Sequence, residues 1–341
     1  MSLLVRLSGD ARTRGLGQAR ASPGEAEAVR SAIRGRLAEL PERTPRMQGF
    51  LAAQWDATRR FVPEAIAEIE GIAEGFGLAR EEVFDFLHAS CLADLAAAAA
   101  ETDGCSAFSA RGIVAKNRDF RPEHARLQRV FAHAEPAWGE RQVLCLGSLG
   151  APGAWSSGMN SDGFALADTH IATADHGPGV LRYFLMTRLL ATCTRVEQAL
   201  DVIVSLPHAG GGSLVLGDST GAAAAVELRH SRVWITRGEA VARTNHYTAA
   251  PEPLAPVEHS APRLAFLEAA LAEDPARDPR SLLATRAPVA LCRLAPDPHQ
   301  TLAGAVWDCR SLTALIADGP PCSTAWTRFV WDGRMWRETH A

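Results

Sequence analysis

The spacing of apolar residues changes at position 103, and this change restricts the folds open to the chain. Before it, apolar residues recur at helical spacing. Pro63 suits a first helical turn, and Gly75 or Gly77 suits a helix end. After it, short apolar or alternating runs are separated by turn residues, which is typical of strands. The predicted helices are 25–40, 45–61, 63–75 and 80–100, and the predicted strands are 106–115, 143–149, 163–170, 213–216, 222–228, 233–236 and 303–308.

Further helical blocks interrupt the predicted strands. They span 179–191 with 195–206, and 262–272 with 280–286. Strands and helices that occur in blocks favour an α+β fold over an alternating parallel arrangement. The simplest packing places two mostly antiparallel sheets face to face, with helices covering both outer faces. Because 341 residues with 47% hydrophobic content can bury a large core, we expect one domain over residues 1–341.

Composition argues against several classes of protein. The chain has 35 basic and 39 acidic residues and no basic run, so a nucleic-acid partner is not expected. The N-terminal apolar run is too short for a secretory signal, and no stretch approaches the roughly 20 residues that span a bilayer. We therefore expect a cytoplasmic protein without a membrane partner.

The sequence also lacks the usual signatures of cofactors and metals. The seven cysteines include no CxxC pair, which argues against a disulfide framework or a zinc site. No Gly-Lys-Ser/Thr follows the glycines at 210–212, and His170 and His176 lack the spacing of helical metal ligands. We expect no cofactor and no metal.

The dipeptide Gly104-Cys105 lies where the pattern changes. If the peptide bond before Cys105 were cut, that residue would carry both a thiol and an α-amine, whose free pKa is roughly 8. The preceding Asp103-Gly104 offers an uncrowded backbone, which attack by the thiol on the Gly104 carbonyl requires. By residue type alone, however, a lone cysteine is usually buried and inert.

Several motifs occur in an order that resembles one family. They are 70–78 (Glu-Gly-Ile-Ala-Glu-Gly-Phe-Gly-Leu), Asp103-Gly-Cys105, Asn117-Arg-Asp119, Gly158-Met-Asn-Ser-Asp-Gly163, Asp218 with Glu227, and Thr244-Asn-His246. This series resembles the isopenicillin-N (acyl-coenzyme A:6-aminopenicillanate) acyltransferase family of N-terminal nucleophile hydrolases, whose distant relatives are bile-salt and penicillin V hydrolases. The resemblance implies a four-layer αββα sandwich. It also implies self-cleavage between Gly104 and Cys105, giving a helical α chain (1–104) and a catalytic β chain (105–341) that stay associated.

The resemblance assigns roles to particular residues. Cys105 would be the nucleophile, and Asp119 would hydrogen-bond the new α-amine and orient it. Asn245 would donate a hydrogen bond to the oxyanion of the tetrahedral intermediate. His246 is expected to support the turn that carries Asn245, while Asn117 either closes a hairpin or contacts the site.

The chain departs from the family pattern at other positions. Lys116 stands where relatives carry Gln or Arg, and is either a solvated cation or a contact of the substrate or nucleophile. Relatives usually place an Asn after the strand at 163–170, where this chain offers Thr169 and His170 as replacements. Arg263 and the segment 299–301 are candidate neighbours for the family's C-terminal Arg.

The expected function is hydrolysis of a linear, non-peptide amide through a thioester on Cys105, after self-cleavage. The partner would be a small-molecule amide, and transfer of the acyl group to an amine or thiol is less favoured than transfer to water. Two alternatives stay open: an unprocessed member of the fold that binds a small molecule or partner, and a papain-like thiol hydrolase with a His base. The sequence leaves open the acyl and amine groups of the substrate and the possibility of a homo-oligomer.

Overall fold

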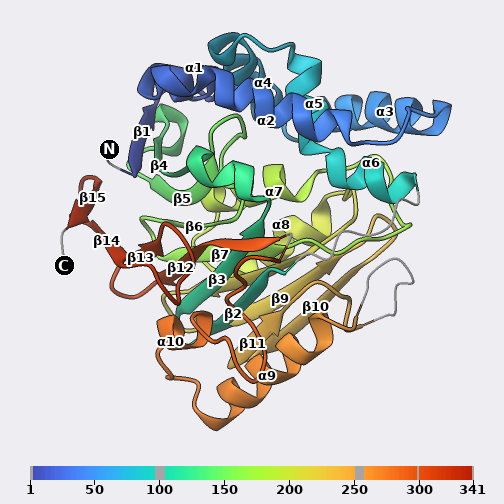
Figure 1. Ribbon diagram of the computed structural model, residues 1–341. Helices are drawn as coiled ribbons and strands as arrows, with labels where there is room; N and C mark the ends of the chain where they lie inside the picture. The colour runs from blue at the N-terminus through green and yellow to red at the C-terminus, as the bar shows by residue number, and fades with distance from the viewer. Residues whose placement is uncertain (1–2, 97–103, 250–256, 298, 340–341) are drawn as a thin grey trace.

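The fold is built on two β-sheets, seen in a computed structural model that describes residues 3–96, 104–249, 257–297 and 299–339 (Figure 1). In the larger, eight-stranded sheet, the first two strands pair in parallel and every later neighbour pairs antiparallel. In spatial order its strands are β1 (Leu4–Ser8), β4 (Gln128–Ala134), β5 (Gln142–Ser148), β6 (Ser157–Asn160), β7 (Phe164–Thr169), β8 (Ser213–Asp218), β9 (Ala223–Leu228) and β10 (Val233–Gly238).

The seven-stranded sheet is antiparallel throughout. In spatial order its strands are β11 (Ala240–Arg243), β2 (Ser106–Ala110), β3 (Ile113–Phe120), β12 (Gln300–Asp308), β13 (Thr313–Ala317), β14 (Trp326–Trp331) and β15 (Trp336–Thr339). The two mostly antiparallel sheets confirm the α+β class predicted from the sequence.

Helices cover the outer face of each sheet (Figure 1). On the side of the eight-stranded sheet lie α1 (Ala11–Ala21), α2 (Ala26–Ala38), α3 (Pro45–Phe61), α4 (Pro63–Phe76), α5 (Arg80–Leu87), α6 (Ala89–Leu95), α7 (Arg182–Thr192) and α8 (Val196–Ser205). On the side of the seven-stranded sheet lie α9 (Ser260–Glu273) and α10 (Pro279–Leu283). Short 3-10 helices occupy Pro23–Glu25, Pro122–Leu127 and Pro136–Trp138.

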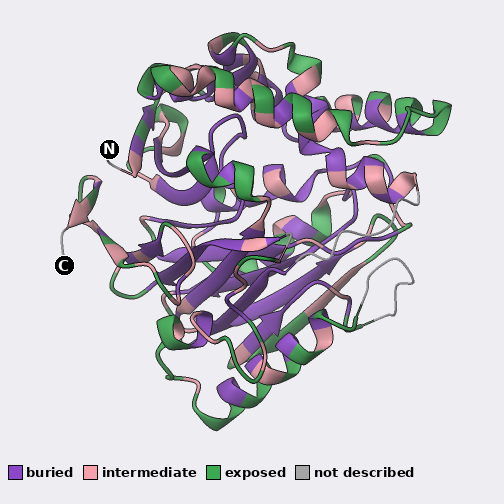
Figure 2. Cartoon of the chain, in the orientation of Figure 1, coloured by how far each residue is buried: buried purple, intermediate pink, exposed green. Residues whose placement is uncertain are grey.

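Buried residues, drawn purple in Figure 2, make up most of the strands of both sheets, and the apolar ones among them form clusters between successive layers. One cluster lies between α1–α8 and the eight-stranded sheet, a second between the two sheets, and a third between the seven-stranded sheet and α9 with α10. The second cluster includes Trp307 and Phe329, both fully buried. The layers are therefore helices, sheet, sheet and helices, and the predicted αββα sandwich is confirmed.

Several predicted helix ends match the structure. Pro45 and Pro63 open α3 and α4, and the Thr44 hydroxyl accepts a hydrogen bond from the Met47 N–H at 3.2 Å. Gly77 ends α4 with a φ of 66°, a conformation that glycine adopts without strain.

The N-terminal third differs from the prediction in three ways. The strand β1 and the helix α1 were not predicted. The predicted helix 80–100 is two helices, because at His88 the backbone N–H is shared between the carbonyls of Phe84 and Asp85, which tightens and ends α5. Of this predicted helix, 97–100 lies outside the described residues.

The prediction of one strand over 106–115 was also wrong. Arg111 and Gly112 have positive φ angles of 54° and 84°, so the chain turns there and forms the hairpin of β2 and β3. As a consequence, Asn117 lies within β3 and not at the end of a hairpin.

The glycines of the 70–78 motif allow α1 and α4 to cross in close contact. A Cβ atom at Gly71 would lie 2.1 Å from the Arg12 carbonyl oxygen, and one at Gly15 would lie 2.2 Å from that of Glu68. Only glycine allows the two backbones to approach this closely. This motif therefore serves helix packing.

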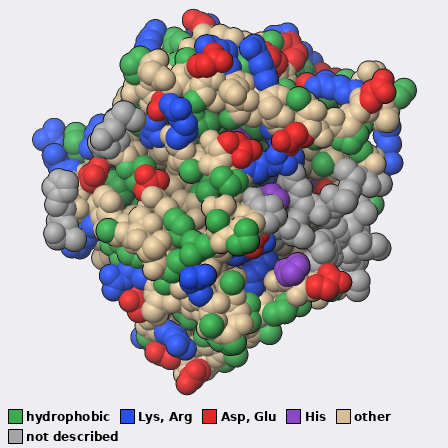
Figure 3. Space-filling view, viewed as in Figure 1, with side chains coloured by type: hydrophobic (Ala, Val, Ile, Leu, Met, Phe, Trp, Pro, Cys, Tyr) green, Lys and Arg blue, Asp and Glu red, His purple; other side chains and the backbone are tan. Residues whose placement is uncertain are grey.

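The surface carries charges of both signs. On the face shown in Figure 3, basic and acidic side chains are interspersed. Among the described residues, no helix combines the length and the apolar character needed to cross a membrane.

Candidate active site

The hairpin of β2 and β3 positions the residues around Cys105. Ser106 pairs with Asn117, and Ala107 pairs with Lys116. Because strand side chains alternate between faces, Lys116 and Arg118 lie on the face that meets the other sheet, and Asn117 lies on the face that meets α9 and α10. Cys105 directly precedes β2, and its Sγ–H donates to the backbone oxygen of Asp119 at 3.5 Å.

Arg263, from α9, holds the backbone on both sides of the Gly104–Cys105 bond. Its Nη1 donates to the carbonyl oxygens of Gly104 and Cys105 at 2.6 and 2.7 Å, and to Oγ of Ser106 at 2.9 Å. Its Nη2 donates to Oδ1 of Asn245 at 2.9 Å. Arg263 is only 3% exposed. Its desolvated positive charge is therefore hydrogen-bonded to the oxygen of the carbonyl group that Cys105 would attack.

Asp119 lies against Gly104 from another side. Its Oδ1 accepts a hydrogen bond from Oγ1 of Thr301 at 2.7 Å, while its Oδ2 has no hydrogen-bond partner among the described residues and lies 3.9 Å from Nη1 of Arg293. Burial raises the pKa of Asp119 to about 6, although the Thr301 hydrogen bond and the charges of Arg263 and Arg293 lower it. One oxygen of this buried carboxyl group is thus available to a new donor.

Asn245 connects three elements. Its backbone N–H donates to Oγ of Ser260, at the start of α9, at 2.7 Å, and its Nδ2 donates to the backbone oxygen of His170 at 2.8 Å. His246 has its Nδ1 2.7 Å from the same Ser260 hydroxyl. His246 thus connects the residues that follow β11 to the first residue of α9.

Two candidate residues, Asn117 and Thr169, donate hydrogen bonds to backbone carbonyl oxygens near the site. The Nδ2 of Asn117 donates to the carbonyl oxygens of Leu283 and Leu291 at 2.8 and 2.7 Å. The Thr169 hydroxyl donates to the Thr244 carbonyl oxygen at 2.6 Å. The structure thus brings both residues close to the site, but neither lines the cavity described next.

A cavity of about 50 Å³ adjoins Cys105 between β3, the end of β7 and the helices α6 and α7. A carboxylate and two cations form one buried cluster in its wall: Oδ1 of Asp168 lies 2.5 Å from Nζ of Lys116, and its Oδ2 lies 2.8 Å from Nε of Arg182. Burial alone would raise the pKa of Asp168, but the two cations outweigh burial and lower it. The lining residues are Ser90, Cys105, Lys116, Arg118, Asp119, Phe120, Trp155, Asp168, His170, Arg182 and Tyr183.

His170 is a poor proton carrier in this position. Burial and the nearby Arg182 guanidinium hold its pKa well below the usual value, so the ring is neutral at physiological pH. Its backbone oxygen accepts the hydrogen bond from Asn245.

Sequence reasoning missed part of this cavity. Arg118 lies between two motif residues, and strand alternation would have placed it on the same face as Lys116. Asp168 interrupts an apolar strand, and a carboxylate at such a position indicates a buried polar site. Arg182 and Arg293 carry no local signal. For the described part of the chain, no cluster of three or more His, Cys, Asp or Glu side chains is arranged to hold a metal.

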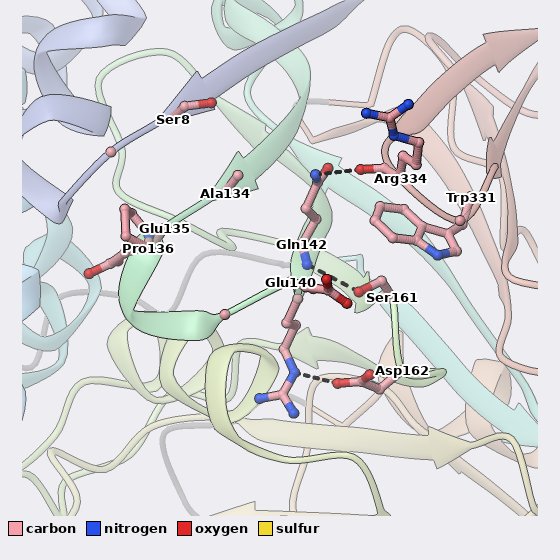
Figure 4. Close-up of a pocket in the computed structure, with 14 residues that line it drawn as sticks. Ser8, Ala134, Glu135, Pro136, Glu140, Gln142, Ser161, Asp162, Trp331 and Arg334 are labelled. Atoms are coloured by element: carbon pink, nitrogen blue, oxygen red, sulfur yellow. Dashed lines mark hydrogen bonds and ion pairs between the residues drawn. The ribbon is translucent and has the colours of Figure 1, made fainter.

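A larger pocket of about 590 Å³ lies at the surface between the neighbouring ends of β1, β4 and β5 and the turn of the β14–β15 hairpin (Figure 4). Gln142 spans it, donating from Nε2 to the Arg334 carbonyl oxygen at 2.8 Å. Its lining contains neither cysteine nor histidine, whereas Cys105 lines the smaller cavity.

Comparison with known proteins identifies the family. A family model described as acyl-coenzyme A:6-aminopenicillanic acid acyl-transferase matches residues 105–320. The chain belongs to this family. Its members have the fold of N-terminal nucleophile amidohydrolases and acyltransferases, in agreement with the resemblance inferred from the motifs.

Solved structures give distant matches to this family member. One is a mutant of conjugated bile acid hydrolase from Clostridium perfringens, with 12% identity, a TM-score of 0.46, and coverage of 70% of this chain and 97% of the other. Another is penicillin V acylase from Agrobacterium tumefaciens, with 14% identity, a TM-score of 0.41, and coverage of 69% and 98%. A comparison with curated proteins gave no significant match.

Proposed function

We propose that this protein is a self-processing amidohydrolase that uses Cys105 as an N-terminal nucleophile. The observation that carries the proposal is the hydrogen bond of 2.6 Å from Arg263 to the Gly104 carbonyl oxygen, directly beside the Cys105 thiol. The match of the family model supports it further, because the matched region begins at Cys105.

Self-cleavage would proceed by an N-to-S acyl shift. Sγ of Cys105 attacks the Gly104 carbonyl carbon, the C–N bond breaks, and the thiol proton passes to the departing nitrogen. Arg263 stabilises the negative charge that develops on the Gly104 oxygen. Water then hydrolyses the thioester, which leaves a carboxylate on Gly104 and a free thiol and α-amine on Cys105.

The new α-amine would be held by Asp119. Gly104 contacts this carboxyl group so closely that a Cβ atom on Gly104 would lie 2.1 Å from Oδ2. That oxygen has no hydrogen-bond partner among the described residues and is buried, so an ammonium group nearby would satisfy it and lower the raised pKa of Asp119.

In turnover, the α-amine takes the thiol proton and Sγ attacks the carbonyl carbon of a linear amide. Collapse of the tetrahedral intermediate breaks the C–N bond, the proton goes to the leaving amine, and a thioester on Cys105 remains. Asn245 is the oxyanion donor in this proposal, supported by its hydrogen bond to Arg263. Water completes hydrolysis, whereas an amine or thiol acceptor would complete acyl transfer.

Intact mass of the denatured, purified protein tests the proposal. We expect two chains, residues 1–104 and 105–341, and a single uncut chain for Cys105→Ala. Cys322→Ala, which changes a half-buried cysteine that contacts Cys292 and does not line the cavity, should be cut like the normal protein. Uncut normal protein would refute self-processing and favour a binding role or a thiol hydrolase with a His base.

A further inference from the structure

We propose that the cavity beside Cys105 binds an anionic group of the substrate through Arg118, so that the preferred substrates are amides with a carboxylate near the scissile bond. As a statement about substrates, this inference rests on the proposed amide hydrolysis. The preference of the cavity for an anion is measured independently of that activity below.

Arg118 is a buried cation whose hydrogen-bond acceptors are neutral. Its Nη1 donates to Oε1 of Gln128 and its Nη2 to Oγ of Ser148, both at 2.8 Å. The side chain is 4% exposed, and within the described ranges no carboxylate forms an ion pair with it. Burial lowers the pKa of Arg118 to about 10, so it stays charged at neutral pH.

A buried charge without a counter-ion is unfavourable, and an anion placed beside it removes much of that cost. Arg118 lines the same cavity as Cys105. A planar guanidinium is well suited to bind a carboxylate, because its N–H groups match the two oxygens.

Asp168 and Asp318 attract Arg118 electrostatically, but among the described residues neither forms an ion pair with it. Lys116 and Arg182 share the carboxylate of Asp168, which leaves one positive charge in excess within that cluster. Asp119 also lines the cavity, but its carboxyl group contacts Thr301 and lies 3.9 Å from Arg293. The cavity therefore presents excess positive charge next to the nucleophile.

The size of the cavity limits what part of a substrate it holds. Its volume is about 50 Å³, which is enough for a small group such as a carboxylate and not for a whole amide. Because Cys105 lies in the same lining, the bound anion would stand close to the scissile carbonyl. It could belong to the acyl half or to the amine half of the substrate.

The alternative is that Arg118 only stabilises the thiolate of Cys105. Two alkylating reagents of similar size separate these roles: iodoacetate carries a carboxylate, and iodoacetamide is neutral. An anion site accelerates the alkylation of Cys105 by iodoacetate but not by iodoacetamide. Thiolate stabilisation instead changes the alkylation rates of both reagents by the same factor. Peptide mass mapping gives the rate at Cys105, and the half-buried Cys322 of the same chain serves as the internal reference.

We expect the iodoacetate-to-iodoacetamide rate ratio at Cys105 to exceed that at Cys322 by at least about tenfold, the usual effect of one charge-assisted hydrogen bond. Arg118→Gln should abolish this excess, and Arg118→Lys should retain part of it. Arg126→Gln, which changes an exposed arginine bound to Glu25, should leave the ratio unchanged.

Equal ratios at Cys105 and Cys322 in the normal protein would overturn the proposal. So would an Arg118→Gln variant in which both rates fall and their ratio stays the same. If Arg118→Gln does not fold, the comparison within the normal protein and the Arg118→Lys variant still decide the outcome.

Matched substrates then identify which half carries the anion. Glutaryl 4-nitroanilide is compared with pentanoyl 4-nitroanilide, and pentanoyl 3-carboxy-4-nitroanilide with the same neutral parent. We expect kcat/KM to rise at least about tenfold for one of the carboxylates, and a preference for the neutral parent over both would refute the substrate class. If no amide is cleaved while the reagent ratio is as expected, the proposed hydrolysis fails and the anion site stands.

Discussion

Among single residues, Gly104 has the least freedom to change. A Cβ atom there would lie 2.1 Å from Oδ2 of Asp119 and 2.1 Å from Nη1 of Arg293. Both groups are fixed, since Asp119 is bound by Thr301 and Arg293 is bound by Asp297 at 2.6 Å. Packing alone therefore restricts the residue that precedes Cys105.

Gly104→Ala should destabilise the uncut chain and slow its cleavage. The added methyl group would force Asp119 and Arg293 apart, at a cost of about 1–3 kcal/mol. Urea unfolding in the Cys105→Ala background measures the stability, and a time course of intact mass in the normal background measures the cleavage. Gly24→Ala is the control, because nothing lies within 4 Å of the added atom; equal effects of the two changes would contradict the packing argument.

Asp119 should make the stability of the uncut chain depend on pH. Burial raises its pKa from 3.8 to about 6, so the folded chain keeps a proton that the unfolded chain releases. The free energy of unfolding should therefore fall as the pH rises through this window, by about 3 kcal/mol if the whole shift is expressed.

Asp119→Asn in the Cys105→Ala background removes this titration. We expect the variant to be more stable than its parent at pH 7 and similar to it near pH 4, as measured by urea unfolding at both pH values. The same stability difference at both pH values would show that Asp119 is not the titrating group.

At the scale of elements, the crossing of α1 and α4 should be intolerant of a single methyl group. Gly71→Ala would place its Cβ atom 2.1 Å from the Arg12 carbonyl oxygen. This oxygen belongs to the backbone of α1, which cannot move aside as the end of a flexible side chain can. We expect a loss of about 2 kcal/mol or more in the free energy of unfolding. Gly35→Ala, in an open position of α2, should instead be neutral or stabilising. Similar values for the two variants would mean that α1 shifts to make room.

Helices and strands were predictable where the residues that the structure buries are also the apolar residues of the sequence pattern. The helices α3 and α4 have apolar buried faces and open with proline, so the sequence predicted them well. In contrast, the buried face of α1 includes Arg14 and Gln18, and α1 therefore shows no apolar period. The strand β14 is mostly half-exposed, and Thr327 and Arg328 interrupt its apolar residues.

Residues of the candidate site were predictable only where they belong to a sequence motif. Cys105, Asp119 and Asn245 follow from the order of motifs, although their catalytic roles stay predictions. Arg118 and Arg182 were missed because arginine is usually exposed, and their burial depends on contacts between distant segments. Arg263 was only a candidate until the structure placed it on the Gly104 carbonyl group.

At the scale of the whole molecule, the two proposed chains should remain associated after cleavage. Gln18 donates to the Ala151 carbonyl oxygen at 2.9 Å, the Gly153 N–H donates to Glu68 at 3.1 Å, and one apolar cluster spans both segments. We expect the chains to elute together in size-exclusion chromatography and to separate only in denaturant. Release of 1–104 under native conditions would contradict this expectation.

The position of the strand β1 also affects how the protein can be produced. It belongs to residues 1–104 but forms the edge of the eight-stranded sheet, where it pairs with β4. Residues 105–341 made alone would leave the hydrogen-bonding groups of β4 uncovered, and such an edge recruits strands from other copies. We therefore expect the segment 1–104 to protect residues 105–341 against aggregation, so that the two pieces stay in solution only when they are expressed together.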